Sequence, residues 1–265
     1  MKEVCTRMVY EETTGMSEKP VVLVTGSSRG IGASLVRHFA LQGCPVVLNY
    51  RSSPEEARRV CESVEGDFPQ ARILPVQGDV GTESGVKGLF DAAEEAFGTV
   101  EVLVNNAGRN MDGPFREMSE EQWDAVHRAV LRSVFLCSRE YARRYSGNRG
   151  CILSMVSGTA FEGRKNGANY CSAKAGVVNL TKDMALELAP EIRVNAIGLG
   201  IIDTEEVMTR YRLREEGPLR KMLESIPLDR LGTPEDVADC ADFLVFRGSY
   251  ITGQTIFVNG GWYMH

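Results

Sequence analysis

Seven short apolar runs recur along the chain, separated by longer amphipathic stretches. The runs lie at 21–25, 45–50, 72–77, 100–106, 150–157, 192–197 and 254–260, and the amphipathic stretches lie at 30–42, 54–65, 83–97, 119–146, 168–189 and 234–246. Such alternation predicts βαβ units, in which right-handed crossovers place parallel strands side by side. The sequence therefore predicts an α/β, Rossmann-type, doubly wound parallel sheet of about seven strands with helices on both faces.

The length of 265 residues is typical of one α/β domain, so we expect residues 20–265 to form a single domain. Residues 1–19 precede the first strand pattern and lack the apolar centre of a signal peptide. We interpret them as a mobile N-terminal tail. The helices at 54 and 234 begin with proline, and Ser53 and Thr233 before them are predicted N-caps.

The segment at about 203–227 differs from the rest of the pattern. It is rich in charge, is interrupted by Gly217 and Pro218, and has little core periodicity. A long insertion after a strand end is typical of a lid over a substrate site. The alternative is a solvated helical hairpin with no gating role.

Composition excludes several classes of protein. A net charge of −6 and a pI near 5.3 argue against a nucleic-acid partner, and no apolar run reaches the roughly 20 residues that span a membrane. The seven cysteines are scattered without a CxxC pair, and the three histidines have no ligand spacing. We therefore expect free thiols, no metal site and a cytoplasmic location.

A glycine-rich turn follows the first predicted strand. Gly26, Gly30 and Gly32 come between this strand and an apolar-periodic helix. Glycines let the backbone turn tightly and approach a pyrophosphate, while the amides at the helix N-terminus favour an anion. This arrangement predicts a dinucleotide site, although a purely structural turn remains an alternative.

The end of the second predicted strand indicates which dinucleotide is bound. The order NYRSS at 49–53 has no carboxylate to bind the free ribose hydroxyls of NAD. Arg29, Arg51 and Ser52 can instead contact a 2′-phosphate, which favours NADP(H). The alternative is that both arginines are solvated surface charges.

Further cofactor positions follow the third and fourth predicted strands. Asp79 is a candidate acceptor for the adenine amino group, or a turn residue. The small residues of NNAG at 105–108 allow close backbone approach, or form an ordinary turn. The predicted cofactor positions in these turns are Gly26, Ser28, Arg29, Gly30, Ile31, Gly32, Asn49, Tyr50, Arg51, Ser52, Asp79, Val80, Asn106, Ala107 and Gly108.

Tyr170 and Lys174 are four residues apart in a predicted helix, so both lie on one helical face. A free tyrosine has a pKa of about 10, and a fixed ammonium beside it favours phenolate and lowers that pKa. The phenol then approaches the range in which acid–base catalysis works. Ser157 is positioned to hydrogen-bond a substrate oxygen on which charge develops. An exposed helix pair is the structural alternative.

Several of these motifs, in this order, resemble the short-chain dehydrogenase/reductase family, especially its beta-ketoacyl reductase-like members. The resemblance covers residues 20–262 and includes TGxxxGIG at 25–32, NNAG at 105–108, IRVNAIGLGIIDT at 192–204 and the stretch 226–261. It implies that Tyr170 exchanges a proton with a carbonyl substrate, Ser157 orients and polarises the carbonyl, and Lys174 binds the nicotinamide ribose. Ile202 and Thr204 would hold the carboxamide.

The resemblance thus implies an NADPH-dependent ketoreductase that acts on a small-molecule carbonyl substrate, free or carrier-bound. It also implies a homotetramer or homodimer, paired through the helices at 119–146 and 168–189. Phe135, Leu136 and Tyr141 either serve that contact or fill the core of the monomer. A large basic patch for an acidic carrier protein is missing from the sequence.

The chain departs from the family pattern at two positions. Val130 stands where the family has an asparagine that helps to hold a proton-relay water, and valine has no polar side chain. A main-chain carbonyl can still hold such a water. Leu199 stands where the family usually has proline, which predicts a looser loop before the lid. Two alternatives therefore stay open: an imine or enone reductase on the same scaffold, and a catalytically weak dinucleotide-binding or sensor protein.

Overall fold

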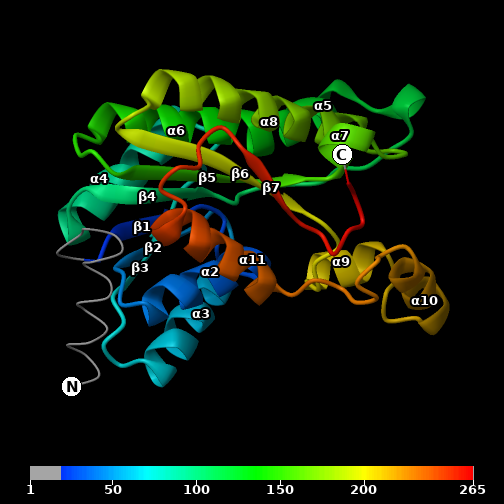
Figure 1. Ribbon diagram of the computed structural model, residues 1–265, viewed down its shortest axis with the longest axis horizontal. Coiled ribbons are helices and arrows are strands. Elements are labelled where there is room, and N and C mark those ends of the chain that lie inside the picture. The colour runs from blue at the N-terminus through cyan, green and yellow to red at the C-terminus, as the bar shows by residue number, and fades with distance from the viewer. Residues whose placement is uncertain (1–18, 265) are drawn as a thin grey trace.

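The computed structural model describes residues 19–264 as one α/β unit. Seven parallel strands form a single sheet in the order β3-β2-β1-β4-β5-β6-β7 (Figure 1). The strands are β1 (Val21–Val24), β2 (Val46–Tyr50), β3 (Ile73–Gln77), β4 (Val100–Asn105), β5 (Gly150–Ser157), β6 (Ile192–Leu199) and β7 (Thr255–Val258). The predicted Rossmann-type fold is confirmed. The predicted tail at 1–19 lies outside the described residues except for Lys19.

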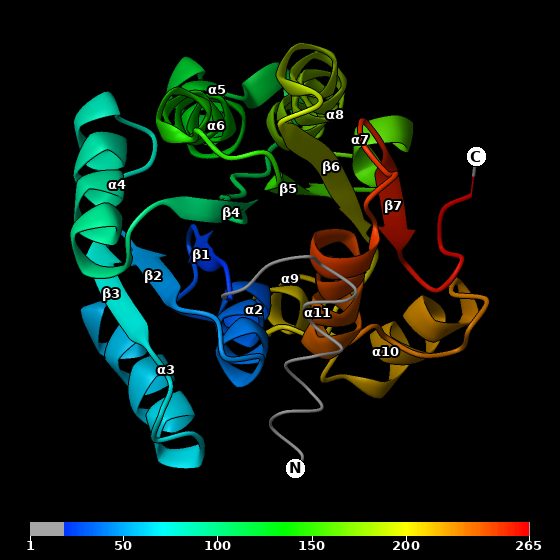
Figure 2. The ribbon, with the colours of Figure 1, turned by 60° about the vertical axis from the view of Figure 1, so that its left-hand side comes forward.

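Helices cover both faces of the sheet (Figure 2). One layer holds α4 (Glu83–Phe97), α5 (Glu120–His127), α6 (Ser133–Arg144) and α8 (Ala168–Leu188), and the other holds α2 (Gly30–Leu41), α3 (Pro54–Asp67) and α11 (Pro234–Asp242). The short α7 (Thr159–Glu162) follows β5. Each parallel strand is joined to the next by such a helical crossover, which is why both faces are covered.

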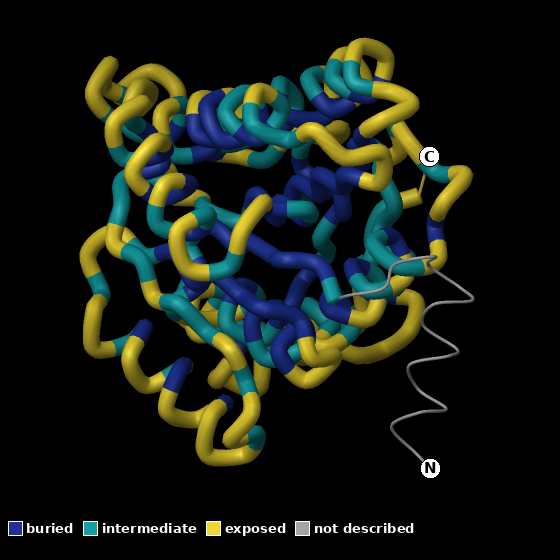
Figure 3. The backbone as a smooth tube through the Cα atoms, turned by 90° about the vertical axis from the view of Figure 1, so that its left-hand side faces the viewer, coloured by how far each residue is buried: buried dark blue, intermediate teal, exposed yellow. Residues whose placement is uncertain are grey.

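The alternating side chains of the strands divide the core into two main layers. Val22 and Val24 of β1 pack in one apolar cluster with α2 and α11, whereas Val21 and Leu23 pack in another with α4 and α6. Successive side chains of a strand point to opposite faces, so a sheet buried on both faces needs a continuous apolar run. Figure 3 shows the buried strands enclosed by half-exposed helices.

The predicted helix at 119–146 is interrupted. A π-helical turn at Arg128–Arg132 separates α5 from α6. Ser133, which follows this turn, donates its hydroxyl to the carbonyls of Ala129 (2.9 Å) and Val130 (3.0 Å). A serine hydroxyl that bonds to carbonyls one turn back competes with the regular backbone pattern. Periodicity does not reveal such a turn, because the apolar spacing changes by only one residue.

The predicted helix starts are correct, and both predicted N-cap residues hold that position, but only Thr233 makes a capping hydrogen bond. Pro54 and Pro234 occupy the first turns of α3 and α11, and Thr233 accepts a hydrogen bond from the Asp236 amide in a full capping box. Ser53 precedes α3, yet its side chain makes no capping hydrogen bond. Its backbone, at φ −125° and ψ 66°, departs from the extended conformation usual for an N-cap.

The segment at 203–227 forms two short helices, α9 (Glu205–Arg210) and α10 (Glu216–Glu224), which lie beyond the ends of β6 and β7 (Figure 1). Ile201, Leu213 and Ile226 are buried in a small apolar cluster of their own beneath these helices. The segment is therefore packed rather than fully solvated. Among residues 19–264, no helix combines the length and the apolar character needed to span a membrane.

Candidate active site

The glycine-rich turn between β1 and α2 is in direct contact with the segment after β4. Gly26 and Gly30 have φ of +59° and +55°, a region that L side chains rarely adopt. A Cβ atom on Gly26 would lie 2.7 Å from the Ala107 Cα, and one on Gly32 would lie 2.6 Å from the Asn106 Nδ2. Two predicted cofactor motifs, far apart in sequence, thus meet at one sheet edge.

Thr25 and Asn106 lock these two segments together. The Thr25 hydroxyl accepts from the amides of Asn106 (3.0 Å) and Ala107 (3.1 Å), and the Asn106 Nδ2 donates to the carbonyls of Thr25 (3.0 Å) and Gly26 (2.9 Å). Sequence reasoning did not include Thr25 in the site. Its place at the end of β1, directly before the first glycine, is the signal that could have found it.

Some predicted cofactor residues serve the framework instead of presenting polar groups. The side chain of Asn49 accepts from the Gly26 amide and donates to the Gly78 carbonyl, both at 3.1 Å, and is buried. Val80 is buried in the core, and the half-buried Tyr50 packs against another part of the core. These three side chains shape the edge, so any contact with a cofactor would come from their backbone or ring surface.

Within residues 19–264, the N-terminal amides of α2 have no capping side chain that would occupy an anion site. Its N-cap residue, Arg29, makes no side-chain capping bond, and the first turn has no acidic residue. Ser28 is partly buried before the helix, and Ile31 in the first turn packs against the core. First-turn amides have no acceptor within the helix, so they remain available to a phosphate.

The basic residues predicted for a 2′-phosphate lie beside this helix. Arg29 is exposed and makes only a long ion pair with Glu56, at 3.6 Å. Arg51 and Ser52 follow β2 directly and are exposed, and Arg51 has no ion pair to any residue in 19–264. The guanidinium groups can therefore turn toward a phosphate with little to break.

Asp79, the predicted adenine ligand, is already engaged on both oxygens. Its Oδ1 accepts from the Gly81 amide and its Oδ2 from Arg128, each at 2.9 Å. The Asp79 carboxylate therefore stabilises the turn, as the alternative prediction expects. A carboxylate has about four lone-pair positions, so a further donor still finds room.

Ser157 lies at the end of β5, and α8, which carries Tyr170 and Lys174, packs against that strand. Ser157 is the last residue of β5, and its Oγ accepts from the Thr159 amide (3.3 Å) and the Thr159 hydroxyl (3.1 Å). Buried Lys174 donates through Nζ to the Met155 carbonyl of the same strand, at 2.6 Å. This bond fixes α8 to the strand that carries Ser157.

Tyr170 and Lys174 share one face of α8, with the Lys174 Nζ 5.6 Å from the centre of the Tyr170 ring. Buried Asn169 places the start of the helix: its Nδ2 donates to the Met111 carbonyl (2.9 Å), and its Oδ1 accepts from the Tyr170 amide (2.8 Å). Sequence reasoning did not single out Asn169. Its position directly before the tyrosine was the available signal.

The electrostatics of the pair differ from the sequence expectation. Loss of water contact raises the pKa of Tyr170, the Glu206 carboxylate adds to the rise, and Arg164 and Arg210 partly oppose it. Burial lowers the pKa of Lys174 to about 8, a shift that Glu206 partly opposes. The expected net lowering of the Tyr170 pKa is therefore not seen, because burial disfavours the charged form of both groups.

Ile202 and Thr204 lie between β6 and α9. Ile202 is buried and bridges to Gly232. Thr204 is the N-cap of α9, and its methyl group faces the glycine turn, where a Cβ atom on Gly30 would lie 3.5 Å away. Thr204 and the glycine turn therefore approach each other across the sheet edge.

The two departures from the family pattern are well packed. Val130 is fully buried in an apolar cluster with Val126, Val134 and Val177. Leu199 is the last residue of β6 and is paired with both Ser157 and Val258. The predicted looseness at Leu199 is wrong, because the strand extends through that residue and its neighbours hold it on both sides.

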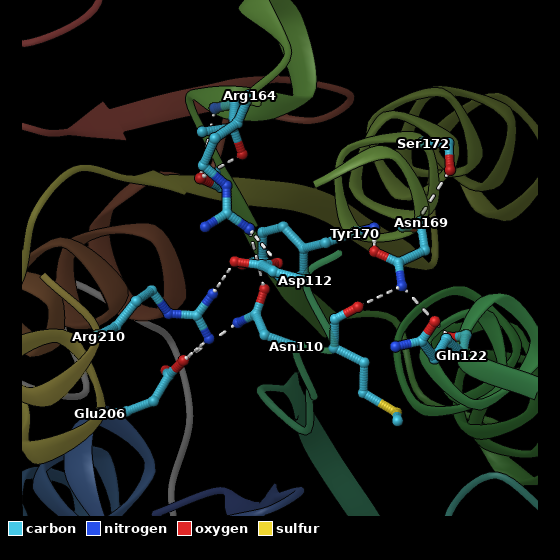
Figure 4. A network of polar contacts seen from close by, with 12 residues as sticks. Asn110, Asp112, Gln122, Arg164, Asn169, Tyr170, Ser172, Glu206 and Arg210 are labelled. Atoms are coloured by element: carbon cyan, nitrogen blue, oxygen red, sulfur yellow. Dashed lines mark hydrogen bonds and ion pairs between the residues drawn. The ribbon is translucent and has the colours of Figure 1, made fainter. Parts of the chain in front are cut away.

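A network of charged side chains lies at the mouth of the site, and sequence reasoning missed it. Arg164, which precedes α8, and Arg210 of α9 both contact Asp112 from the loop after β4 (Figure 4). Glu206 of α9 joins them through Arg210 and Asn110. These residues come from two loops and from α9, which are far apart in the sequence, so no local sequence pattern identifies them as part of a site.

Comparisons with known proteins agree with this architecture. The family model described as enoyl-(acyl carrier protein) reductase matches residues 26–263. The chain is 39% identical over 245 residues to the 3-oxoacyl-[acyl-carrier-protein] reductase FabG of Staphylococcus epidermidis, covering 91% of this chain and 98% of that protein. It is 38% identical over 257 residues to 3beta-hydroxysteroid dehydrogenase 1 of Eggerthella lenta, covering 96% and 95%.

Among solved structures, a short-chain dehydrogenase/reductase of Brucella melitensis described as a glucose/ribitol dehydrogenase aligns with a TM-score of 0.86. That alignment has 30% identity and covers 94% of this chain and 98% of the other. The fold and the relatives define an oxidoreductase with a Rossmann-type core. The chain belongs to the short-chain dehydrogenase/reductase family, and its beta-ketoacyl reductase-like character is shared with the FabG relatives.

Proposed function

We propose that this protein catalyses the NADPH-dependent reduction of a carbonyl to an alcohol. The observation that carries the proposal is the bond from the Lys174 Nζ to the Met155 carbonyl, at 2.6 Å, which holds the helix of Tyr170 against the strand that ends at Ser157. A hydroxyl donor, a titratable phenol and a cation brought to the end of one parallel strand would form a proton-transfer site.

The cofactor fits the residues at the sheet edge. The glycine turn and the uncapped amides of α2 would take the pyrophosphate, and the Asn106 to Gly108 backbone would border the nicotinamide side. Arg29, Arg51 and Ser52 would take the 2′-phosphate, which supports NADPH over NADH. Ile202 and Thr204 would contact the carboxamide, and Asp79 and Val80 the adenine.

The raised pKa of Tyr170 suits the reductive direction. A phenol that keeps its proton at neutral pH can donate it to the carbonyl oxygen, while bound NADPH supplies the hydride. Ser157 would hydrogen-bond the same oxygen and stabilise its developing charge. Lys174, whose pKa of about 8 keeps most of it charged at pH 7, would bind the ribose and return a proton toward Tyr170.

The test is NADPH oxidation over a panel of ketones and 3-oxoacyl thioesters, with wild type compared with Tyr170→Phe. We expect the variant to lose about 10²- to 10⁴-fold in kcat, because general acid catalysis has that size, while NADPH affinity stays within about twofold. The matched control is Tyr250→Phe, which removes a fully exposed phenol and should keep wild-type activity. Full activity in Tyr170→Phe would remove Tyr170 from proton transfer.

Two other functions use the same geometry. Reduction of an enone is supported by the description of the matching family model, so the panel includes a 2-enoyl thioester and a cyclic imine. A silent dinucleotide-binding protein or sensor is supported only by Val130. Tight NADPH binding without turnover on any substrate would favour the silent protein, whereas turnover on the enoyl thioester or imine alone would favour the enone or imine reductase.

The assembly and the lid complete the proposal. We infer a homotetramer or homodimer on family analogy, with α5, α6 and α8 at one interface. Leu136 and Tyr141 are buried in the monomer core, which leaves exposed Phe135 as the member of the predicted trio available for contact. Residues 203–227 would act as a substrate lid.

Four cysteines are free and buried: Cys44, Cys61, Cys137 and Cys151. Free thiols fit a cytoplasmic location for the enzyme. Its carbonyl substrate would be either carrier-bound or free.

A further inference from the structure

Three segments that border the candidate site are tied together by a cluster of charged side chains, which we call the mouth network: Asn110, Asp112, Arg164, Glu206 and Arg210 (Figure 4). Arg164 Nη2 donates to Asp112 Oδ1 and Arg210 Nη1 donates to Asp112 Oδ2, both at 2.8 Å. One carboxylate is therefore gripped by two guanidinium groups. This is the arrangement with which arginines bind an anionic ligand, here filled by a residue of the chain itself.

The mouth network lies directly against the proposed catalytic tyrosine. The Arg164 Cζ lies 5.6 Å from the centre of the Tyr170 ring. The guanidinium rests on Gly167, where a Cβ atom would lie 3.0 Å from the Arg164 Nε. That Nε is buried and has no hydrogen-bond partner among residues 19–264. An arginine held with an unsatisfied buried donor is placed at some cost in stability, which indicates a role other than stabilising the fold.

The mouth network is open to solvent. Arg164 lines a cavity of about 440 Å³ together with Pro114, Phe115 and Lys165, a cavity that Tyr170 does not line. The side chain of Asp112 is 29% exposed, and those of Arg164 and Arg210 are 18% and 21% exposed. A charged group that approaches from solvent can therefore interact with the carboxylate as well as with the two guanidinium groups.

The charges of the mouth network cancel without a ligand. Asp112 and Glu206 balance Arg164 and Arg210, and Glu206 accepts from both Arg210 and Asn110. Within residues 19–264, Asp112 is the carboxylate that pairs with Arg164. Removing the Asp112 charge would therefore leave Arg164 as an unpaired cation beside Tyr170.

We propose that Asp112 is a specificity-determining residue: it fills the two-arginine site beside Tyr170 and so restricts carbonyl reduction to uncharged substrates. This inference rests on the proposed function. A keto acid would bring a second carboxylate against Asp112 and Glu206, and like charges at short range in a partly dry site repel. Its neutral ester has the same carbonyl without that repulsion.

The experiment compares benzoylformate with its methyl ester. In wild type we expect kcat/KM for the ester to exceed that for the acid. In Asp112→Asn, which keeps the shape and removes the charge, the acid-to-ester ratio should rise on the order of tenfold or more, because a charge-assisted arginine contact becomes available. Adding Arg164→Gln to Asp112→Asn should cancel that rise.

Glu205→Gln is the matched control. Glu205 is a lid carboxylate that pairs with Arg214 and not with the mouth network, so its variant should leave the ratio within about twofold of wild type. A wild type that prefers the acid, or an unchanged ratio in Asp112→Asn, would overturn the inference. A rise of equal size in Glu205→Gln would do the same, because it would reduce the effect to overall lid charge.

A binding measurement separates this inference from the proposed function. Calorimetry with the purified protein should give benzoate a Kd at least tenfold weaker than that of benzamide in wild type, with the gap closing in Asp112→Asn. If no carbonyl is reduced but benzoate still binds more weakly than benzamide, the proposed reaction is wrong, whereas the inference that Asp112 excludes a carboxylate from this site stands. If ketones are reduced but benzoate binds wild type as well as benzamide does, the role of Asp112 is wrong. The wild-type comparison remains decisive if Asp112→Asn does not fold.

Discussion

The cofactor edge and the mouth network are built in opposite ways. At the cofactor edge, Thr25, Asn49 and Asn106 hold backbone against backbone through hydrogen bonds, and Gly26 and Gly32 leave no room for a Cβ atom. At the mouth, long charged side chains from two loops and from α9 meet across partly exposed space. The first region is fixed by steric contacts, whereas the second is held by ion pairs whose strength a substitution can change.

The largest expected effect tests the steric side of this comparison. A Cβ atom on Gly32 would lie 2.6 Å from the Ser27 Cα and 2.9 Å from the Gly26 carbonyl oxygen, and backbone cannot rotate away. We expect Gly32→Ala to lower the free energy of unfolding by about 2–3 kcal/mol and NADPH affinity by more than about tenfold. Urea denaturation and a fluorescence titration with NADPH measure the two quantities.

Gly88→Ala is the control for Gly32→Ala. Gly88 lies in α4, and a Cβ atom there would meet nothing within 4 Å. Alanine in an exposed helix interior should raise the free energy of unfolding by about 0.5–1 kcal/mol without changing NADPH affinity. If Gly32→Ala loses neither stability nor NADPH affinity, as expected for Gly88→Ala, the claim that steric contacts fix the cofactor edge is wrong.

Val130→Asn tests whether the missing family asparagine limits the reaction. Val130 is fully buried among apolar side chains, so an amide there finds few partners and should lower the free energy of unfolding by about 1–3 kcal/mol. If proton return limits turnover, kcat rises in spite of the lower stability. Stopped-flow and steady-state rates with NADPH measure it.

Val134→Asn is the matched variant for Val130→Asn, because Val134 is 4% exposed in the same cluster but does not occupy the family asparagine position. It should lose similar stability and gain no turnover. An unchanged or lower kcat in Val130→Asn would count against a limiting relay. The Val130 carbonyl, which already accepts from Ser133, would then be the better candidate for holding a water.

Arg51→Ala tests the cofactor preference. Arg51 is exposed after β2 and has no ion pair within the described residues, so its loss should barely change stability. We expect KM for NADPH to rise about tenfold and KM for NADH to stay unchanged, because only NADPH has the 2′-phosphate. Arg59→Ala on α3 is the control. Equal changes for both cofactors would leave Arg51 as a surface charge.

The two regions also differ in how far sequence could predict them. The order of strands and helices, the glycine turn and the Tyr170 to Lys174 spacing depend on local pattern, so they could be read directly. The π-helical turn at Val130 interrupts a helix without a break in the apolar pattern, and the pKa of Tyr170 depends on burial and on Glu206 from a distant helix. Such effects depend on tertiary contacts that periodicity and spacing do not encode.

The smallest expected effect tests the charged side. Arg210 and Arg214 are both on or next to α9, but Arg210 is 21% exposed and pairs with Asp112, whereas Arg214 is 64% exposed and pairs with Glu205. We expect Arg210→Gln to raise KM for the ketone substrate about threefold and to cost at most about 1 kcal/mol of stability, since partly exposed ion pairs contribute little. Steady-state kinetics with ketone as the varied substrate measure the change. Arg214→Gln should change neither value.

Salt provides a second test, because it screens exposed charges over about 10 Å at 0.1 M. Raising the ionic strength should raise KM in wild type and in Arg214→Gln, which both keep the Arg210–Asp112 pair, but not in Arg210→Gln. Identical behaviour of the two variants would mean that the contact between Arg210 and Asp112 has no effect on substrate binding, and the contrast between a steric cofactor edge and an electrostatic mouth would then hold only for the cofactor edge.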